Sequence, residues 1–259
     1  MSGGSPSDPG NGTNRMPPPW LGLPLGVLLL VLLWTLVARR VNAPYILPAP
    51  SAVLASLIAQ RALIAHHTIA TLIVVLTGFG LGFALATVLG YFIAHFPLLE
   101  RLLMPLIVAM QAVPIIAVAP LLVYVLGSGT PVKVAVSTLI VFFPMLVNTV
   151  TGLRNIDRSY RDLMHILSAT RWQTLRLLEI PAALPVLLAG LRVGVTLSVI
   201  GAVVGEFLAP DQGLGALVTR ARGAYNDPLV FAALLVLVLL AVGLYGLAAL
   251  SERLVLRNR

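Results

Sequence analysis

The chain has 259 residues, of which 59% are hydrophobic and only 10% are charged. Soluble proteins average about a quarter charged residues, so this composition excludes an ordinary soluble domain and predicts an all-α membrane protein with several spanning helices. The formal net charge is +8, but the arginines cluster at the ends of apolar runs and form no stripe with aromatic residues, so we expect no nucleic-acid partner. The chain has no cysteine, which excludes disulfides and thiolate chemistry.

Composition divides the N-terminal part of the chain. Residues 1–19 are rich in Gly, Ser, Pro and Asn, which predicts a disordered segment, and we place it in the cytoplasm. Residues 20–67 hold the first spanning helix, at about 21–38, followed by Arg39 and Arg40 and an outer interfacial segment. In that segment we expect Ser51 to cap a short helix that runs to about Ile64.

Residues 68–250 carry five further apolar runs and form the predicted core, and residues 251–259 form a cytoplasmic tail. The runs lie at about 68–94, 102–126, 132–153, 184–208 and 229–250. The run at 102–126 contains Pro105, Pro114 and Pro120, which predicts a broken or kinked helix. Two other runs carry small residues at intervals of four, which lets helix backbones approach closely. These residues are Gly78, Gly82, Ala86 and Gly90 in one run, and Gly190, Gly194, Ser198 and Ala202 in the other.

The connection at residues 154–185 is too charged to span a membrane, because it carries five Arg, two Asp and one Glu before Pro181. Its apolar residues repeat at helical spacing, which predicts two short amphipathic helices with a bend between Ser168 and Arg171. We expect Pro181 and Pro185 to end the second helix and to start the next span. A long structured loop is uncommon without a function, and this one favours docking of an apolar helix face into a groove on another protein.

No residues are arranged for catalysis. The one lysine, Lys133, lacks the glycine spacing of a phosphate-binding loop, and no HExxH or GxSxG sequence is present. The four histidines have no carboxylate at the spacing of metal ligands. We therefore expect neither an enzyme nor a metal site, and any energy that the protein uses must come from a partner.

Three polar residues within the spans are candidates for a translocation path: Gln111, Asn148 and Glu206. For Gln111 and Asn148 the alternative is a hydrogen bond across helices. Glu206 lies near the end of its span, where a carboxylate faces either a cavity or a cationic partner, here Arg220 or Arg222.

The charged loop resembles a known motif. Asp162-Leu163-Met164, Ser168 and Leu178-Glu179-Ile180-Pro181 keep the spacing of the EAA loop of bacterial ATP-binding-cassette importer permeases, with Asp for Glu, Leu-Met for Ala-Ala and Ser for Gly. The stretches PAALPVLLAGLR, at 181–192, and VVGEFLAPDQGLGALV, at 203–218, are similar to the sulfonate, nitrate, taurine and thiamine-precursor branch of that family. The resemblance covers roughly residues 43–250.

This resemblance implies a MetI-like permease fold with six transmembrane helices and a cytoplasmic coupling-helix loop. It implies a homodimer with a second permease copy, two cytoplasmic ATPase subunits that carry ATP and Mg²⁺, an extracytoplasmic solute-binding protein, and no cofactor on this chain. The chain would lie in the bacterial inner membrane with both termini cytoplasmic, which places eleven of the 17 basic residues inside. The residues expected to transmit coupling are Asp162, Leu163, Ile166, Leu167, Ser168, Arg171, Leu178, Ile180 and Pro181, with Arg154, Arg158 and Arg161 beside them.

The solute class is indicated less directly. The stretches 111–129 and 199–207 look most similar to permeases for thiamine pyrimidine precursors or riboflavin, more than to those for alkanesulfonates, taurine or nitrate. No positive charge lies in mid-span, which favours a neutral or aromatic solute. The alternative from another class is an ion-coupled secondary transporter or channel, which would need carboxylates near the membrane midplane and repeated halves. Only Glu206 is available for that role, and it lies near an end of its span.

Overall fold

The structure is a computed structural model that describes residues 19–41, 43 and 45–257. In these residues every regular element is a helix, as the composition predicts. The predicted segment 1–19 lies outside the described residues except for its last residue, and so do residues 258 and 259 of the tail. The chain separates into two compact units, Met1–Pro50 and Ser51–Arg259, which are described separately.

The first unit contains α1, Pro19–Val41, which confirms the first predicted span and extends it at both ends. Its leucines are mostly exposed, as is expected for a helix whose surroundings are lipid. Arg39 and Arg40 occupy its last turn. The indole Nε1 of Trp34 donates a hydrogen bond to the Pro48 carbonyl at 3.2 Å, which holds the proline-containing segment that follows α1.

The second unit begins within α2 and contains the rest of the described chain. Its elements are α2 (Pro50–Ala59), α3 (Arg61–His95), α4 (Pro97–Gln111), α5 (Ile115–Leu126), α6 (Thr130–Arg154), α7 (Arg158–Ile166), α8 (Arg171–Thr174), the π-helical turn η1 (Leu175–Glu179), α9 (Ile180–Leu208), α10 (Leu214–Gly223) and α11 (Asp227–Arg257). Among the described residues of the whole chain, five helices are long and apolar enough to cross a membrane, and the bent pair α4–α5 makes a sixth span. The six-span, all-α prediction is confirmed in this sense.

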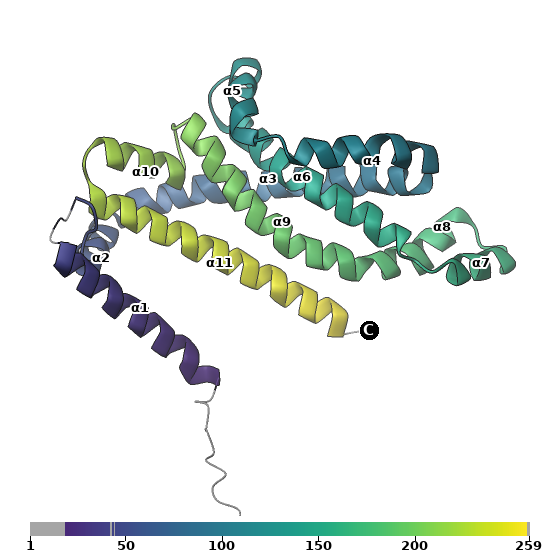
Figure 1. Ribbon diagram of the computed structural model, residues 1–259, viewed down its shortest axis with the longest axis horizontal. Coiled ribbons are helices and arrows are strands. Elements are labelled where there is room, and N and C mark those ends of the chain that lie inside the picture. Colours follow the sequence, from purple (N-terminus) through teal and green to yellow (C-terminus); the bar gives the residue numbers. More distant parts are fainter. Residues whose placement is uncertain (1–18, 42, 44, 258–259) are drawn as a thin grey trace, which may run out of the picture. The chain divides into compact units, whose positions relative to one another are not determined.

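The span formed by α4 and α5 is broken. The two helices meet at 97°, and Figure 1 shows α5 turned sharply away from the line of α4. The break falls directly before Pro114, which lacks a backbone N–H and disfavours helical geometry in the residue before it. The predicted broken helix is therefore confirmed, with the second of its three prolines at the break and Pro105 and Pro120 inside helices.

The helix α6 packs against both α3 and α9, and glycines make the closest approaches on both sides. A Cβ atom added to Gly78 of α3 would lie 2.4 Å from the Ser137 hydroxyl oxygen of α6, and one added to Gly201 of α9 would lie 2.6 Å from Ser137 Cα. A Cβ atom added to Gly205 would likewise lie 2.7 Å from Lys133 Cα. The small residues therefore bring helices together as predicted, although Gly201 and Gly205 were not in the predicted set.

Two predicted boundaries in the second unit are wrong. The short helix from Ser51 ends at Ala59, and α3 begins at Arg61 rather than near residue 68. The 35 residues of α3 extend over about 52 Å, which exceeds the roughly 30 Å hydrocarbon core, so the helix continues beyond the apolar run that defined the predicted span. The helix α10 was not predicted, since its ten residues are too few to form a span.

We predict that Gly78→Leu destabilises the protein by about 3 kcal/mol, because the new side chain would force α3 away from α6. The control is Gly80→Leu on the same helix, where an added Cβ meets nothing within 4 Å. Thermal unfolding of the two purified variants in one detergent measures the difference. Equal melting temperatures would contradict the packing of α3 on α6 described here.

Candidate functional site

The charged loop folds into a short helix, α7, and a second helical segment that starts at Arg171, with the predicted bend between them. Asp157 begins α7 by accepting a hydrogen bond from the Ser159 N–H at 2.9 Å. This bond and a second from the Ser159 hydroxyl lower the pKa of Asp157 below its usual value. Thr170 begins α8 with a reciprocal capping box to Gln173. Figure 1 shows the loop at the end of the second unit opposite α10.

The bend between the two helices is a left-handed turn at Ser168, whose φ is +51°. The Ser168 N–H donates to the His165 carbonyl and the Ala169 N–H to the Met164 carbonyl, each at 3.0 Å. This pair of bonds is a Schellman motif with Ser168 at the position that glycine usually occupies. The structure thereby explains why the EAA pattern has glycine here, since a left-handed conformation costs other residues roughly 1–2 kcal/mol.

The apolar face of α7 has no partner among the described residues. None of the nine residues of α7 is buried. The side chain of Ile166 is 79% exposed, that of Leu167 is 66% exposed, and Leu163 is half-exposed. Clustered exposed apolar groups of this kind mark an interaction surface. The sequence-predicted residues of α7 therefore do share one accessible face.

The other predicted coupling residues lie in different surroundings. Asp162 and Arg171 are exposed, and neither side chain forms a hydrogen bond or ion pair with another described residue. Leu178 packs against the buried apolar cluster that α3 and α6 share. Ile180 is half-exposed, and Pro181 lies in the first turn of α9. The predicted set thus divides into an exposed part in the loop and a packed part where the loop joins α9.

Two of the arginines expected beside the docking face brace the chain internally instead. Arg154 forms an ion pair with Glu100 at the start of α4. Arg161 donates a hydrogen bond to the Leu153 carbonyl at 2.8 Å, which ties α7 to the end of α6. Among the described residues, Arg158 and Arg171 form no such side-chain contact.

The prediction that Pro181 and Pro185 end the second loop helix is wrong. The helix continues from Arg171 to Leu208, with η1 as a π-helical turn between α8 and α9. The ring of Pro181 would clash with the Leu177 carbonyl in an ideal α-helix, and it supplies no N–H to that carbonyl. One wider turn accommodates this disruption without a break in the helix.

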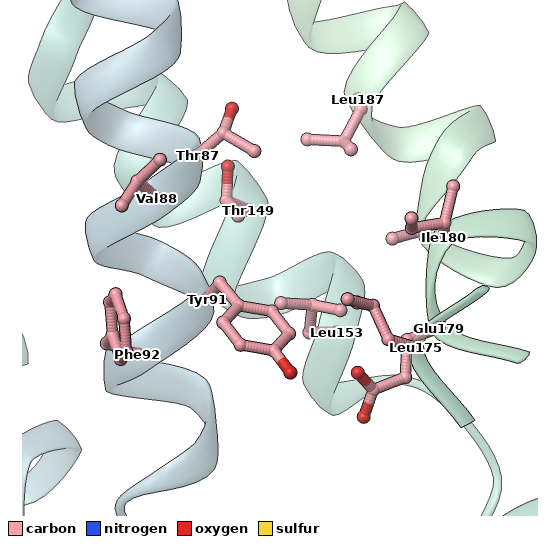
Figure 2. Close-up of a pocket in the computed structure, with 11 residues that line it drawn as sticks. Thr87, Val88, Tyr91, Phe92, Thr149, Leu153, Leu175, Glu179, Ile180 and Leu187 are labelled. Atoms are coloured by element: carbon pink, nitrogen blue, oxygen red, sulfur yellow. The ribbon is translucent and has the colours of Figure 1, made fainter. Parts of the chain in front are cut away.

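A cavity of about 280 Å³ lies between α3, α6 and the η1–α9 junction. Figure 2 shows Val88 and Phe92 of α3 on one side, Ile180 and Leu187 of α9 on the other, and the Tyr91 ring pointing between them. At its edge Glu179 of η1 is only 4% exposed, and its Oε1 lies 2.9 Å from Nε2 of His95. Sequence reasoning named Glu179 only as part of the EAA-like motif and did not predict its contact with His95.

The three candidate path residues are not brought together. Gln111 is exposed at the end of α4, and Asn148 is half-buried in α6. Glu206 is fully buried. It lies near Lys133, since the preceding residue, Gly205, packs against Lys133. Lys133 is 15 residues before Asn148, or about 22 Å along α6. Their assignment to a path stays a prediction.

Glu206 caps α10. Its carboxylate accepts hydrogen bonds from the Thr71 hydroxyl and from the Gly215 N–H, each at 2.7 Å. The two preceding N–H groups are also held by side chains of α3, with Leu214 donating to Thr71 Oγ1 at 2.8 Å and Gly213 to His67 Nδ1 at 3.0 Å. These are the N–H groups that a helix start leaves without partners, and a carboxylate is favoured there. Among the described contacts Glu206 pairs with neither Arg220 nor Arg222.

A second contact holds the same connection from the side of α6. Lys133, which is 1% exposed, donates to the Asp211 carboxylate and to the Gln212 carbonyl, the latter at 2.8 Å. Burial alone would raise the pKa of Asp211, but the hydrogen bonds from Lys133 and from the Gln212 N–H bring it below its usual value. The sequence feature that could have indicated the capping by Glu206 is the Gly213-Leu214-Gly215 run, because a side chain at either glycine would meet Glu206.

We predict that Gly213→Ala destabilises the protein by about 3 kcal/mol. The new Cβ would lie 2.1 Å from the Glu206 carboxyl carbon, and the φ of +111° disfavours a side chain. Gly223→Ala at the other end of α10 is the control, because nothing lies within 4 Å of its Cβ position. Thermal unfolding measures the difference. Equal decreases in the melting temperatures of the two variants, or no decrease in either, would contradict the capping of α10 by Glu206.

Comparison with known proteins identifies the family to which this helical architecture belongs. Residues 86–257 match the family model described as binding-protein-dependent transport system inner membrane component. The riboflavin transport system permease protein RibX of Chloroflexus aurantiacus is 45% identical over 242 residues, covering 92% of this chain and 90% of that protein. The formylaminopyrimidine transport permease protein ThiX of Halalkalibacterium halodurans is 38% identical and covers 87% and 90%. The taurine transport system permease protein TauC of Escherichia coli is 28% identical and covers 90% and 88%.

Solved structures support the same fold. A chain from the inward-facing structures of the MetNI methionine ABC transporter superposes with a TM-score of 0.68 at 18% identity, covering 76% of this chain and 98% of that one. The resemblance of the charged loop, the six-span helical architecture and these matches agree. The chain belongs to the binding-protein-dependent transport system inner membrane component family, as a MetI-like permease subunit of an ABC importer.

Proposed function

We propose that this permease is driven by two cytoplasmic ATPase subunits, which carry the ATP and Mg²⁺, and that the α7–α8 loop docks onto them. The observation that carries the proposal is the exposed apolar face of α7, formed by Leu163, Ile166 and Leu167. A cleft that received this face would remove it from water, as in other helix-in-groove contacts. Arg158 and Arg171 would then be available to acidic groups at the rim of the cleft.

The connections of the loop suit the transmission of movement. Asp162 and the other exposed loop residues would make the contact, and the Schellman turn at Ser168 would keep the two loop helices at a fixed angle. The bond from Arg161 to Leu153 links α7 to α6, while α8 leads through η1 into α9. Leu178, Ile180 and Pro181 lie at that second junction. Displacement of a docked loop would therefore move α6 and α9, which fits alternation between inward-open and outward-open forms.

The assembly we propose contains a second copy of this permease, with the solute path between the two copies and Gln111 and Asn148 as candidate lining residues. The chain would lie in a bacterial inner membrane with the loop and both termini in the cytoplasm, in agreement with the excess of arginine on that side. An extracytoplasmic binding protein would then meet the end that contains α10. The capping of α10 by Glu206 and the Lys133–Asp211 pair would make that end rigid.

For the solute, we infer a largely uncharged aromatic nitrogen heterocycle of the thiamine pyrimidine precursor or riboflavin type. The relatives named for riboflavin and formylaminopyrimidine are 45% and 38% identical, whereas the one named for taurine is 28% identical. Arg192 lies inside α9, contrary to the expectation that no positive charge lies in mid-span, but it is paired with Glu252, and Lys133 of α6 is paired with Asp211. A sulfonate or nitrate would find neither cation free.

The alternative of an ion-coupled transporter or channel is not favoured. It needs a carboxylate that can exchange an ion in mid-span. Glu206 is committed to the start of α10, and both of its oxygens accept hydrogen bonds from the protein.

We predict that Ile166→Asp lowers ATP-dependent uptake by at least about tenfold, because a charge in the docking cleft would cost 1.4 kcal/mol or more. The control is His165→Asp, which places the same charge on the same helix one residue earlier. Uptake by the complete transporter in proteoliposomes, together with the amount of ATPase that copurifies, measures both effects. Similar losses in the two variants, or none in either, would count against docking through this face.

We also predict that riboflavin or formylaminopyrimidine, supplied with the cognate binding protein, is taken up and that a hundredfold excess of taurine does not compete. The measurement is uptake of the radiolabelled solute into vesicles that contain the complete transporter. Competition by taurine at this hundredfold excess would contradict the inferred solute class and leave the coupling proposal unaffected.

A further inference from the structure

The contact between Glu179 and His95 joins two elements that no short stretch of chain connects. Glu179 ends the π-helical turn η1, directly after the loop, and His95 is the last residue of α3. Their Oε1 and Nε2 atoms are 2.9 Å apart, and the residues are separated by 84 positions in the sequence. The Glu179 side chain is 5% exposed and that of His95 is 30% exposed, so the carboxylate side of the contact is shielded from water.

The hydrogen-bond pattern shows that a proton joins the two side chains. Nδ1 of His95 lies 2.8 Å from the Tyr91 carbonyl oxygen, which can only accept, so Nδ1 carries a hydrogen. Nε2 faces a carboxyl oxygen, and that contact also needs a hydrogen between the two atoms. Either the imidazole carries both hydrogens or Glu179 carries one. The Tyr91 ring also packs on the imidazole, with the two ring centroids 4.2 Å apart.

At the loop end, the contact between Glu179 and His95 spans the opening between α3 and the junction of η1 with α9. In the half of the unit nearer α10, the two helices pack directly, with Phe79 against Gly194 and Val75 in one apolar cluster with Val199. At the loop end the cavity of about 280 Å³ separates them, as Figure 2 shows for Val88 and Leu187. The two helices are thus packed together at one end and bridged across an opening at the other.

The π-helical turn sets the direction in which Glu179 points. A π-helical turn contains one residue more than an α-helical turn, so the residues that follow are rotated by about 100° relative to a continuous α-helix. Glu179 lies at the end of this turn, immediately before Ile180 and Pro181. The sequence feature that distorts the helix therefore also aims the carboxylate at α3.

We propose that Glu179 and His95 are positioning residues for transport: their contact makes α3 follow the loop, so that the cavity between α3 and α9 closes and opens with the movement of α8 and η1. The inference rests on the proposed docking of the loop and adds the route by which α3 takes part. The direct route from the loop reaches α6 and α9 through the chain itself, whereas α3 is reached through its packing on α6, as at Gly90 and Thr149, and through this side-chain contact with η1.

The test is the amount of solute taken up per ATP hydrolysed by the complete transporter in proteoliposomes. Glu179→Ala and His95→Ala should each lower this ratio by at least about fivefold, and the double variant should be no worse than either single one. The exchanged variant, Glu179→His with His95→Glu, should recover a large part of the ratio. Glu100→Ala is the matched control, since it breaks the ion pair with Arg154 at the same end of the unit but away from η1.

Thermal unfolding distinguishes a positioning role from a folding defect. We expect Glu179→Ala and His95→Ala to lose coupling while their melting temperatures and their assembly with the ATPase match those of Glu100→Ala. Unchanged uptake per ATP in Glu179→Ala and His95→Ala would overturn the inference, and so would failure of the exchanged variant to recover. Asp162→Lys in the loop distinguishes the two levels. If it abolishes solute-stimulated ATP hydrolysis while the pair variants stay coupled, only the inference fails; if it has no effect, the proposed docking fails and the inference with it.

Discussion

The close approach of α3 and α9 to α6 is the constraint on which the rest of the second unit depends. Side chains at Gly78, Gly201 or Gly205 would overlap Ser137 or Lys133, so the three helices are held at backbone contact over their α10-side halves. Lipid supplies little hydrophobic force between helices, which leaves such packing and interhelical hydrogen bonds to hold the bundle. The Ser137 hydroxyl adds one of these bonds, to the Ser198 carbonyl of α9 at 3.0 Å.

The two ends of the second unit differ in how their helices are held together. At the α10 end, buried side chains of α3, α6 and α9 hold the backbone of residues 211–215, and Glu206 serves as a helix cap. At the loop end, α3 and α9 separate around a cavity, and the contact between Glu179 and His95 bridges it. If the ATPase docks at the loop end as proposed, this opening leaves room there for α3 and α9 to move relative to each other.

Sequence reasoning predicted the features that depend on local pattern. The spans, a break or kink in the run 102–126, the small-residue contacts and the bend near Ser168 are all visible in residue spacing, although which of the three prolines marks the break is not. It failed where distant partners decide the outcome: Glu206 bonds Thr71, 135 positions earlier, and no local signal shows that a carboxylate in a span caps a helix. It also failed at Pro181, because proline usually ends a helix, whereas here a π-helical turn carries the helix through to Leu208.

The central claim is that the α7–α8 loop carries the movement of the ATPase into the membrane helices. The most direct measurement is the distance between spin labels at His165→Cys in the two permease copies of the complete transporter, with and without bound ATP; the chain has no cysteine of its own. ATP binding is expected to bring the two labels closer together. An unchanged distance in a preparation that still imports solute would contradict it.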